Sequence, residues 1–162
     1  MAKELVVYRH KSSFLLRLVV YALIAAAIVA CDAKNVEKEP EQQLVVTNAF
    51  MYALPPGKTV GAVYLTLENK TGRTHILNYV HSPIASKVEV HRNIYENGMM
   101  QMRHVPHLTL DPKAKLVFEP GGYHLMVFDI EKPLKENDQF ELNLEFEGGH
   151  YLMTQVDVRS HK

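Results

Sequence analysis

The sequence has very little cysteine: Cys31 is the single one among 162 residues, in a chain with seven methionines and nine histidines. Blue-copper electron-transfer sites need a cysteine thiolate, and thiol-redox proteins need a reactive pair of cysteines. Cys31 directly follows the predicted N-terminal targeting segment (1–30), so the sequence after it contains no cysteine, which excludes both classes and any internal disulfide. An apolar core must therefore hold a folded part of about 120 residues, which is feasible at this size.

The sequence also lacks the usual patterns of catalytic sites. It has no Ser-His-Asp, His-Cys or paired-carboxylate pattern in a recognisable context, and no phosphate-binding glycine loop. It has no set of three His or carboxylate ligands that would leave an open zinc position. We therefore predict that the protein is not an enzyme.

The charge balance argues against nucleic-acid binding. Lys and Arg total 18, as do Asp and Glu, and residues 1–30 hold four of the basic and one of the acidic residues. The remainder of the chain has a net charge of about −3 with neutral histidine, which is not the basic surface that nucleic acids require.

The first 30 residues have the pattern of a targeting segment. A basic region precedes a thirteen-residue apolar run from Leu18 to Ala30, which is short compared with the roughly 20 residues of a membrane span. The residues before Cys31 resemble a bacterial lipoprotein box, and this resemblance implies that Cys31 is lipidated after cleavage. The alternative is an uncleaved signal anchor, because the apolar stretch reaches seventeen residues when it is counted from Phe14.

Both alternatives tether the protein outside the inner membrane. Asp32 resembles the signal that retains lipoproteins in the inner membrane of bacteria with two membranes, so we expect the periplasmic side of that membrane. Residues 31–42 are charged and almost without large apolar groups, and such a segment cannot bury enough surface to fold. We predict that they form a flexible tether.

Residues 43–159 have the pattern of an all-β domain. Short apolar runs recur between turn signals, and no convincing amphipathic helix lies among them. The predicted strands are 44–50, 61–69, 75–80, 87–91, 115–119, 123–130, 139–146 and 151–158. Eight short strands separated by Pro, Gly and Asn indicate a β-sandwich or barrel.

Four residues with soft or borderline metal-binding side chains follow one another at defined spacing. Ten residues separate His91 from Met102, twenty-one separate Met102 from His124, and one separates His124 from Met126. Thioether sulfur binds Cu(I) well and the harder Zn²⁺, Mg²⁺ and Ca²⁺ poorly, whereas imidazole serves most transition metals. Two imidazoles and two thioethers therefore predict a neutral site for one Cu(I) ion.

The local sequence predicts how two of these ligands are presented. Residues 123–128 are rich in aromatic and branched side chains and are typical of a strand, in which alternate residues project from the same face. His124 and Met126 would then share one face while Leu125 and Val127 point into the core. The alternative is that the His and Met residues only pack, because methionine commonly fills gaps in cores.

Three residues near Met102 are candidate auxiliary ligands: Met99, Met100 and His104. If residues 100–104 are extended, Met100, Met102 and His104 lie on one face. They would supply an auxiliary ligand or a second, weaker copper site, or else pack beside the metal and shield it.

The four-ligand spacing resembles the signature of the PCuAC-type periplasmic copper chaperones: a His, ten residues, a Met, twenty-one residues, then His-x-Met. The segments 88–91, 98–103 and 120–126 are also similar to the core blocks of that family. The resemblance covers residues 44–158 and has two departures. Arg92 stands where some members have Met, and the chain stops at Ser160-His161-Lys162 where some have a His- and Met-rich tail, so we expect one main copper site.

The resemblance implies a cupredoxin-like Greek-key β-sandwich or barrel and an extracytoplasmic copper chaperone. The recipient it implies is the CuA centre of cytochrome c oxidase subunit II, with a thioredoxin-like Sco-type protein as a further partner. We expect the protein to be a monomer. Two other functions stay open: a periplasmic copper-buffering or resistance protein without a dedicated recipient, and a non-metal β-sandwich interaction module.

Overall fold

The computed structural model describes residues 43–161, and the regular secondary structure in this range is β-strand. The predicted targeting segment (1–30) and the whole of the predicted tether (31–42), with the lipidation site Cys31, lie outside the described residues. No helix within residues 43–161 is long and apolar enough to cross a membrane. The strands are β1 (Leu44–Tyr52), β2 (Gly61–Asn69), β3 (His75–His81), β4 (Lys87–Glu96), β5 (Met99–His104), β6 (Leu108–Leu110), β7 (Lys115–Phe118), β8 (Tyr123–Phe128), β9 (Gln139–Phe146) and β10 (His150–Arg159).

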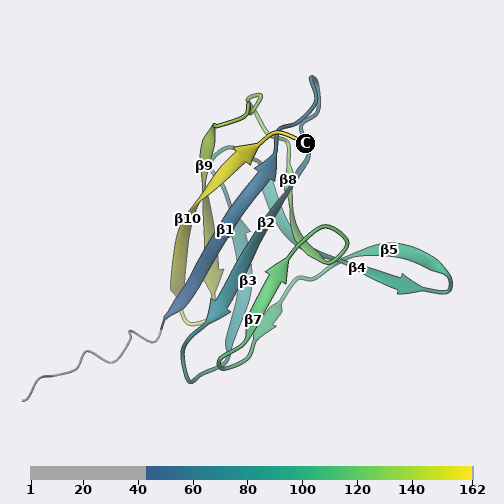
Figure 1. Ribbon diagram of the computed structural model, residues 1–162. Helices are drawn as coiled ribbons and strands as arrows, with labels where there is room; N and C mark the ends of the chain where they lie inside the picture. The colour runs from purple at the N-terminus through teal and green to yellow at the C-terminus, as the bar shows by residue number, and fades with distance from the viewer. Residues whose placement is uncertain (1–42, 162) are drawn as a thin grey trace, which may run out of the picture. The chain divides into compact units, whose positions relative to one another are not determined.

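The strands form one sheet that closes into a barrel (Figure 1). Their order is β5-β4-β8-β7-β2-β1-β10-β9-β3-β6, and β8 also pairs directly with β2. A further pairing of β4 with β3 closes the ring, and it consists of one register pair, Val80 with Val88. β5 and β6 lie outside the ring, beside β4 and β3 respectively. This arrangement confirms the prediction of an all-β, cupredoxin-like barrel.

Alternating side chains fill the inside of the barrel. On β9, Phe140, Leu142, Leu144 and Phe146 are buried while the residues between them are partly exposed. This pattern places every second residue of a strand in the core. Full burial of such a side chain stabilises the fold by about 1.5–3 kcal/mol. The interior is therefore apolar, and polar groups with a function lie on the outer face or at the ends of strands.

The structure adds two strands, β5 and β6, to the eight that the apolar runs predict, and it extends β4 to Glu96. The extension of β4 and all of β5 form a two-stranded hairpin that projects from the barrel (Figure 1). Asn97 and Gly98 join the two strands, and both have positive φ, +52° and +79°. An Asn-Gly pair is the preferred sequence for such a two-residue turn.

Candidate metal centre

Three of the four predicted ligands lie on the outer face of the barrel wall formed by β4 and β8. His91 stands opposite His124 in the antiparallel register, and Glu89 stands opposite Met126. Leu125 and Val127, which alternate with His124 and Met126 along β8, are fully buried, as predicted from the sequence. Opposite residues on adjacent strands share a face, so His91, His124 and Met126 project together from the outside of the wall.

The fourth predicted ligand lies on the other side of His91, on the projecting hairpin. In the β4–β5 register His91 stands opposite His104, and Asn93 stands opposite Met102. Met102 and Met126 are thus both diagonal neighbours of His91, one on each adjacent strand. Diagonal neighbours in a sheet lie about 7–8 Å apart, within reach of long side chains. The register therefore places the other three predicted ligands, Met102, His124 and Met126, around His91, which lies on β4 between β5 and β8.

The four side chains differ strongly in exposure. His124 is 4% exposed, whereas Met102 is 52% exposed. The His91 side chain retains 14% of its accessible surface, and Met126 is half-buried. The group consequently has a covered end at His124 and an open end at Met102.

Each of the two histidines has one ring nitrogen in a hydrogen bond and the other without a partner. Nε2 of His91 lies 2.9 Å from Oε2 of Glu89, and Nδ1 of His124 lies 3.2 Å from the carbonyl oxygen of Gly122. Nδ1 of His91 and Nε2 of His124 are buried and have no hydrogen-bond partner within residues 43–161. Buried polar atoms are nearly always satisfied, so two such nitrogens on neighbouring rings require an explanation.

Metal ligation is one arrangement that would satisfy both nitrogens. A histidine that binds a metal through one nitrogen typically donates its other N–H to a carboxylate or a backbone carbonyl, which are the two partners found here. The ring centroids of His91 and His124 are 6.0 Å apart. Among the described residues no three His, Cys, Asp or Glu side chains form a metal-binding group. The further donors that the register brings to this face are the thioethers of Met102 and Met126.

Glu89 gives the centre a negative charge. The hydrogen bond with His91, followed by the hydrogen bond with Lys87, holds the pKa of Glu89 below its ordinary value of 4.5. The Lys87 ammonium lies 3.0 Å from Oε1 of Glu89 and 4.7 Å from the centroid of the Phe128 ring. The Phe128 ring in turn lies 6.3 Å from the His91 ring. Sequence reasoning missed Glu89, although its position two residues before His91 on one strand was a readable signal.

The structure separates the three auxiliary candidates. Met100 and His104 alternate with Met102 along β5 and so share its face, while Met99 belongs to the opposite face. The His104 ring lies 5.5 Å from that of His91, closer than the His124 ring. Met99 and Met100 are exposed, at 60% and 62%. His104 is therefore the auxiliary candidate that the register brings nearest to the centre.

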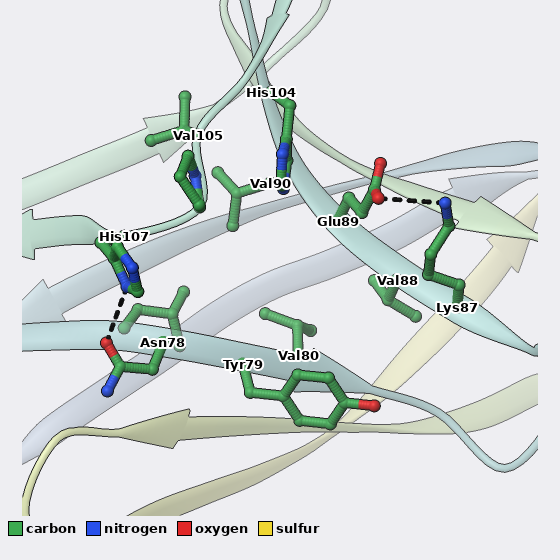
Figure 2. A pocket seen from close by; sticks show the side chains of 12 residues that line it. Asn78, Tyr79, Val80, Lys87, Val88, Glu89, Val90, His104, Val105 and His107 are labelled. Carbon is green, nitrogen blue, oxygen red and sulfur yellow. Dashed lines mark hydrogen bonds and ion pairs between the residues drawn. The ribbon is translucent and has the colours of Figure 1, made fainter.

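Two surface hollows border the centre. One, of about 300 Å³, lies at the seam between β3 and β4, and Figure 2 shows His104, Glu89 and Lys87 around it. The other, of about 280 Å³, is lined by Met126 together with Tyr52, Tyr64 and His161. The centre is thus part of an open surface, which suits an ion that has to be passed to another molecule.

Comparison with known proteins places the chain in a family. Residues 44–158 match the family described as "Putative lipoprotein LpqE-like". The chain is 24% identical over 156 residues to the "Putative lipoprotein Lxx21020" of Leifsonia xyli subsp. xyli, covering 92% of each chain. It is 26% identical over 98 residues to the uncharacterized protein RP573 of Rickettsia prowazekii, covering 60% of this chain and 54% of that one. The match therefore spans about half the length of this second relative.

The solved structures most relevant to the site are PCuAC domains. The CuI-bound protein DR1885 of Deinococcus radiodurans is 25% identical, with a TM-score of 0.60 over 82% of this chain and 87% of that one. The copper-bound PCuAC domain of PmoF2 is 21% identical, with a TM-score of 0.62 over 73% of this chain and 93% of that one, which is evidence for the fold alone. The protein belongs to the LpqE-like family and has the fold of the PCuAC copper chaperone domains.

Proposed function

We propose that the protein is an extracytoplasmic copper chaperone that holds one Cu(I) ion through His91, Met102, His124 and Met126 and passes it on by ligand exchange. The observation that carries this proposal is the pair of buried, unpartnered imidazole nitrogens, which the register places beside two thioethers on one face. The CuI-bound form of DR1885, similar in fold and 25% identical, supports the choice of metal and oxidation state.

The donor set favours Cu(I) over other available metals. Thioethers are soft ligands that select Cu(I), whereas zinc sites in proteins are built from Cys, His and carboxylates. The four donors are neutral when the histidines are, and the ionised Glu89 carboxylate lies beside His91. Glu89 also pairs with Lys87, so the charges of Glu89, Lys87 and one Cu(I) ion would sum to +1 at the occupied site.

The difference in exposure predicts the order of ligand exchange. His124 is covered, and Met102 is open to solvent on the projecting hairpin. An incoming donor from a recipient can reach the metal from the side of Met102 and displace that thioether first. Met100 and His104 share the hairpin face with Met102, so they are proposed as auxiliary ligands that hold the ion during this exchange.

The location and the recipient complete the proposal. The LpqE-like family and the Leifsonia relative are described as putative lipoproteins, which supports lipid attachment at Cys31 or a signal anchor and a position on the periplasmic side of the inner membrane. The proposed recipient is the CuA centre of cytochrome c oxidase subunit II, with a Sco-type protein as a possible second partner of a monomeric carrier. A deletion strain that becomes copper-sensitive but keeps full oxidase activity would instead indicate copper buffering without a dedicated recipient.

The copper site is tested by titrating the full-length protein in detergent with Cu(I) against a chromophoric chelator, with copper K-edge absorption on the product. We expect one equivalent bound with mixed sulfur and nitrogen scattering. Replacing Met102 and Met126 together by Leu should nearly abolish Cu(I) retention while the fold persists, because Leu and Met are close in volume. The matched control replaces Met153, an exposed methionine on β10, by Leu. Equal affinity in the double variant and in this control would overturn the assignment.

A further inference from the structure

The carboxylate of Glu89 is fixed from two sides. Its Oε2 lies 2.9 Å from Nε2 of His91, and its Oε1 lies 3.0 Å from Nζ of Lys87. The three residues occupy alternate positions of β4 and therefore project from the same face. Lys87 is itself placed over the Phe128 ring. Both oxygens of Glu89 are engaged in this way, so its orientation towards His91 is set by the wall of the barrel.

These contacts assign the proton of each imidazole. An ionised carboxylate only accepts hydrogen bonds, so Nε2 of His91 carries the hydrogen and Nδ1 carries the lone pair. The Gly122 carbonyl also only accepts, so the reverse holds for His124: Nδ1 carries the hydrogen and Nε2 the lone pair. The same carbonyl accepts the backbone N–H of Asn93 at 3.1 Å, which ties it to β4. The two nitrogens left with lone pairs are two of the three buried side-chain nitrogens without a partner in the described part of the chain; the third is Nδ1 of His81, on β3.

We infer that Glu89 is the positioning residue of the copper centre: it holds His91 in the tautomer that offers Nδ1 to Cu(I), while the Gly122 carbonyl holds His124 in the tautomer that offers Nε2. This inference rests on the copper site proposed above. Glu89 is not itself a ligand, because a carboxylate oxygen is a hard donor poorly suited to Cu(I) and both oxygens already have partners. A carboxylate partner also raises the basicity of the imidazole, which strengthens its bond to a metal.

Binding of Cu(I) through Nε2 of His91, instead of Nδ1, predicts the opposite change in Cu(I) affinity when Glu89 is removed. If Cu(I) bound Nε2 of His91, the ion would have to displace Glu89 from that nitrogen. Glu89 would then compete with the metal, and its removal would raise the affinity for Cu(I). If Glu89 positions the ring, its removal lowers the affinity. The sign of the effect therefore decides between the two.

The experiment compares Glu89→Ala and Glu89→Gln with the unmodified full-length protein in detergent, using competition with a chromophoric Cu(I) chelator. Loss of such an outer hydrogen-bond partner typically lowers metal affinity 10–100-fold. We expect a loss in this range for Glu89→Ala and a smaller loss for Glu89→Gln, whose amide oxygen can still accept the His91 N–H. The matched control is Glu96→Gln, which removes one negative charge from the same strand at a side chain paired with Arg103 instead of a histidine.

A second readout does not depend on copper. Nitrogen-15 NMR of the imidazole rings in the metal-free protein reports which nitrogen carries the hydrogen. We expect Nε2–H for His91 and Nδ1–H for His124, with the His91 assignment lost in Glu89→Ala and kept in Glu96→Gln. Tight Cu(I) binding that is unchanged or strengthened in Glu89→Ala, or an Nδ1–H tautomer of His91 in the unmodified protein, would overturn the inference and leave the copper site standing. Absence of Cu(I) binding by the unmodified protein would instead overturn the proposed function, and the NMR result would still decide whether Glu89 sets the His91 tautomer.

Discussion

Strand β4 takes part in two regions of opposite character. From Lys87 to Arg92 it forms six register pairs with β8 and has Val88 and Val90 in the core of the barrel. From His91 to Glu96 it pairs with β5 in a hairpin whose side chains are largely exposed, among them Tyr95 at 74%. A hairpin with little buried apolar surface is marginally stable by itself, whereas a wall packed on a core is not. Of the four proposed ligands, His91, His124 and Met126 therefore lie on the firm region and Met102 lies on the weak one.

The largest expected effect comes from damage to the wall. Leu125→Ala removes a fully buried side chain between His124 and Met126. We expect the free energy of unfolding to fall by about 2–5 kcal/mol, as for other buried Leu→Ala changes. Met100→Ala on the exposed hairpin should change it by no more than about 0.5 kcal/mol. Denaturant unfolding measures both, and similar losses in the two variants would refute the division into a firm and a weak region.

Single thioether replacements should sharpen the difference between the two ends of the site. Met102→Leu should speed the transfer of Cu(I) to a competing chelator by roughly tenfold, equivalent to about 1.4 kcal/mol, because the position of first attack is already open. Met126→Leu should weaken equilibrium binding with a smaller effect on the rate of attack. Stopped-flow transfer to the chelator measures the rate, and Met153→Leu is the control. An equal acceleration in the Met102 and Met126 variants would argue against exchange that begins at the hairpin.

A change in the turn should affect the hairpin alone. Gly98 has a φ of +79°, and a Cβ added there meets nothing within 4 Å, so Gly98→Ala introduces backbone strain without a clash. The left-handed conformation costs a non-glycine residue about 1–2 kcal/mol. We expect faster amide hydrogen exchange in β5 and weaker Cu(I) binding, with unchanged exchange in β8. Protection lost equally from both strands would mean that the hairpin and the wall unfold together.

The smallest effect concerns the pH dependence of stability that comes from His75, on β3 of the barrel. Burial, followed by the charges of His150 and Arg73, lowers the pKa of His75 below its ordinary value of 6.5. As the pH falls below 6.5 the unfolded chain binds the proton before the folded protein does, so stability present above pH 6.5 is lost towards the lower folded pKa. His75→Gln should reduce this loss, as measured by thermal unfolding of the metal-free protein between pH 5 and 8. An unchanged pH profile would exclude His75 as its source.

Much of the barrel could be predicted from the sequence, because strands such as β9 alternate strictly between buried and exposed residues. The apolar pattern missed two strands for different reasons: β6 buries Leu108 and Leu110 but has only three residues, whereas β5 buries little. β5 is Met99-Met100-Gln101-Met102-Arg103-His104, with five of its six residues exposed, so it shows no alternation. The Asn97-Gly98 turn carried the missing information. A two-residue turn at that point pairs Glu96 with Met99 and, counting back, His91 with His104.

The groups of the candidate site likewise differ in how far the sequence predicts them. The spacing of the four proposed ligands is readable because it depends on side-chain chemistry. The role of Glu89 was readable in part, since residues two apart on a strand share a face. The role of the Gly122 carbonyl could not be predicted, because every residue has a backbone carbonyl and the residue type does not reveal which one accepts a hydrogen bond. It becomes visible only when the fold places it 3.2 Å from Nδ1 of His124.

The closure of the barrel by the single register pair between Val80 and Val88 has a mechanical consequence. Between Lys87 and Val90, β4 pairs with β8 along one edge, whereas on its other edge it has a single register pair with β3 and one hydrogen bond, from the Val105 N–H to the Val90 carbonyl. A copper ion shared among β8, β4 and β5 would cross-link these three strands beside the β3–β4 closure. A ligand that binds only the folded state stabilises it by an amount that grows as the logarithm of one plus the ratio of free ligand concentration to Kd. Loading would then hold β4 more firmly to β8 and β5 and release would loosen it, so the stability of this side of the barrel would depend on whether copper is bound.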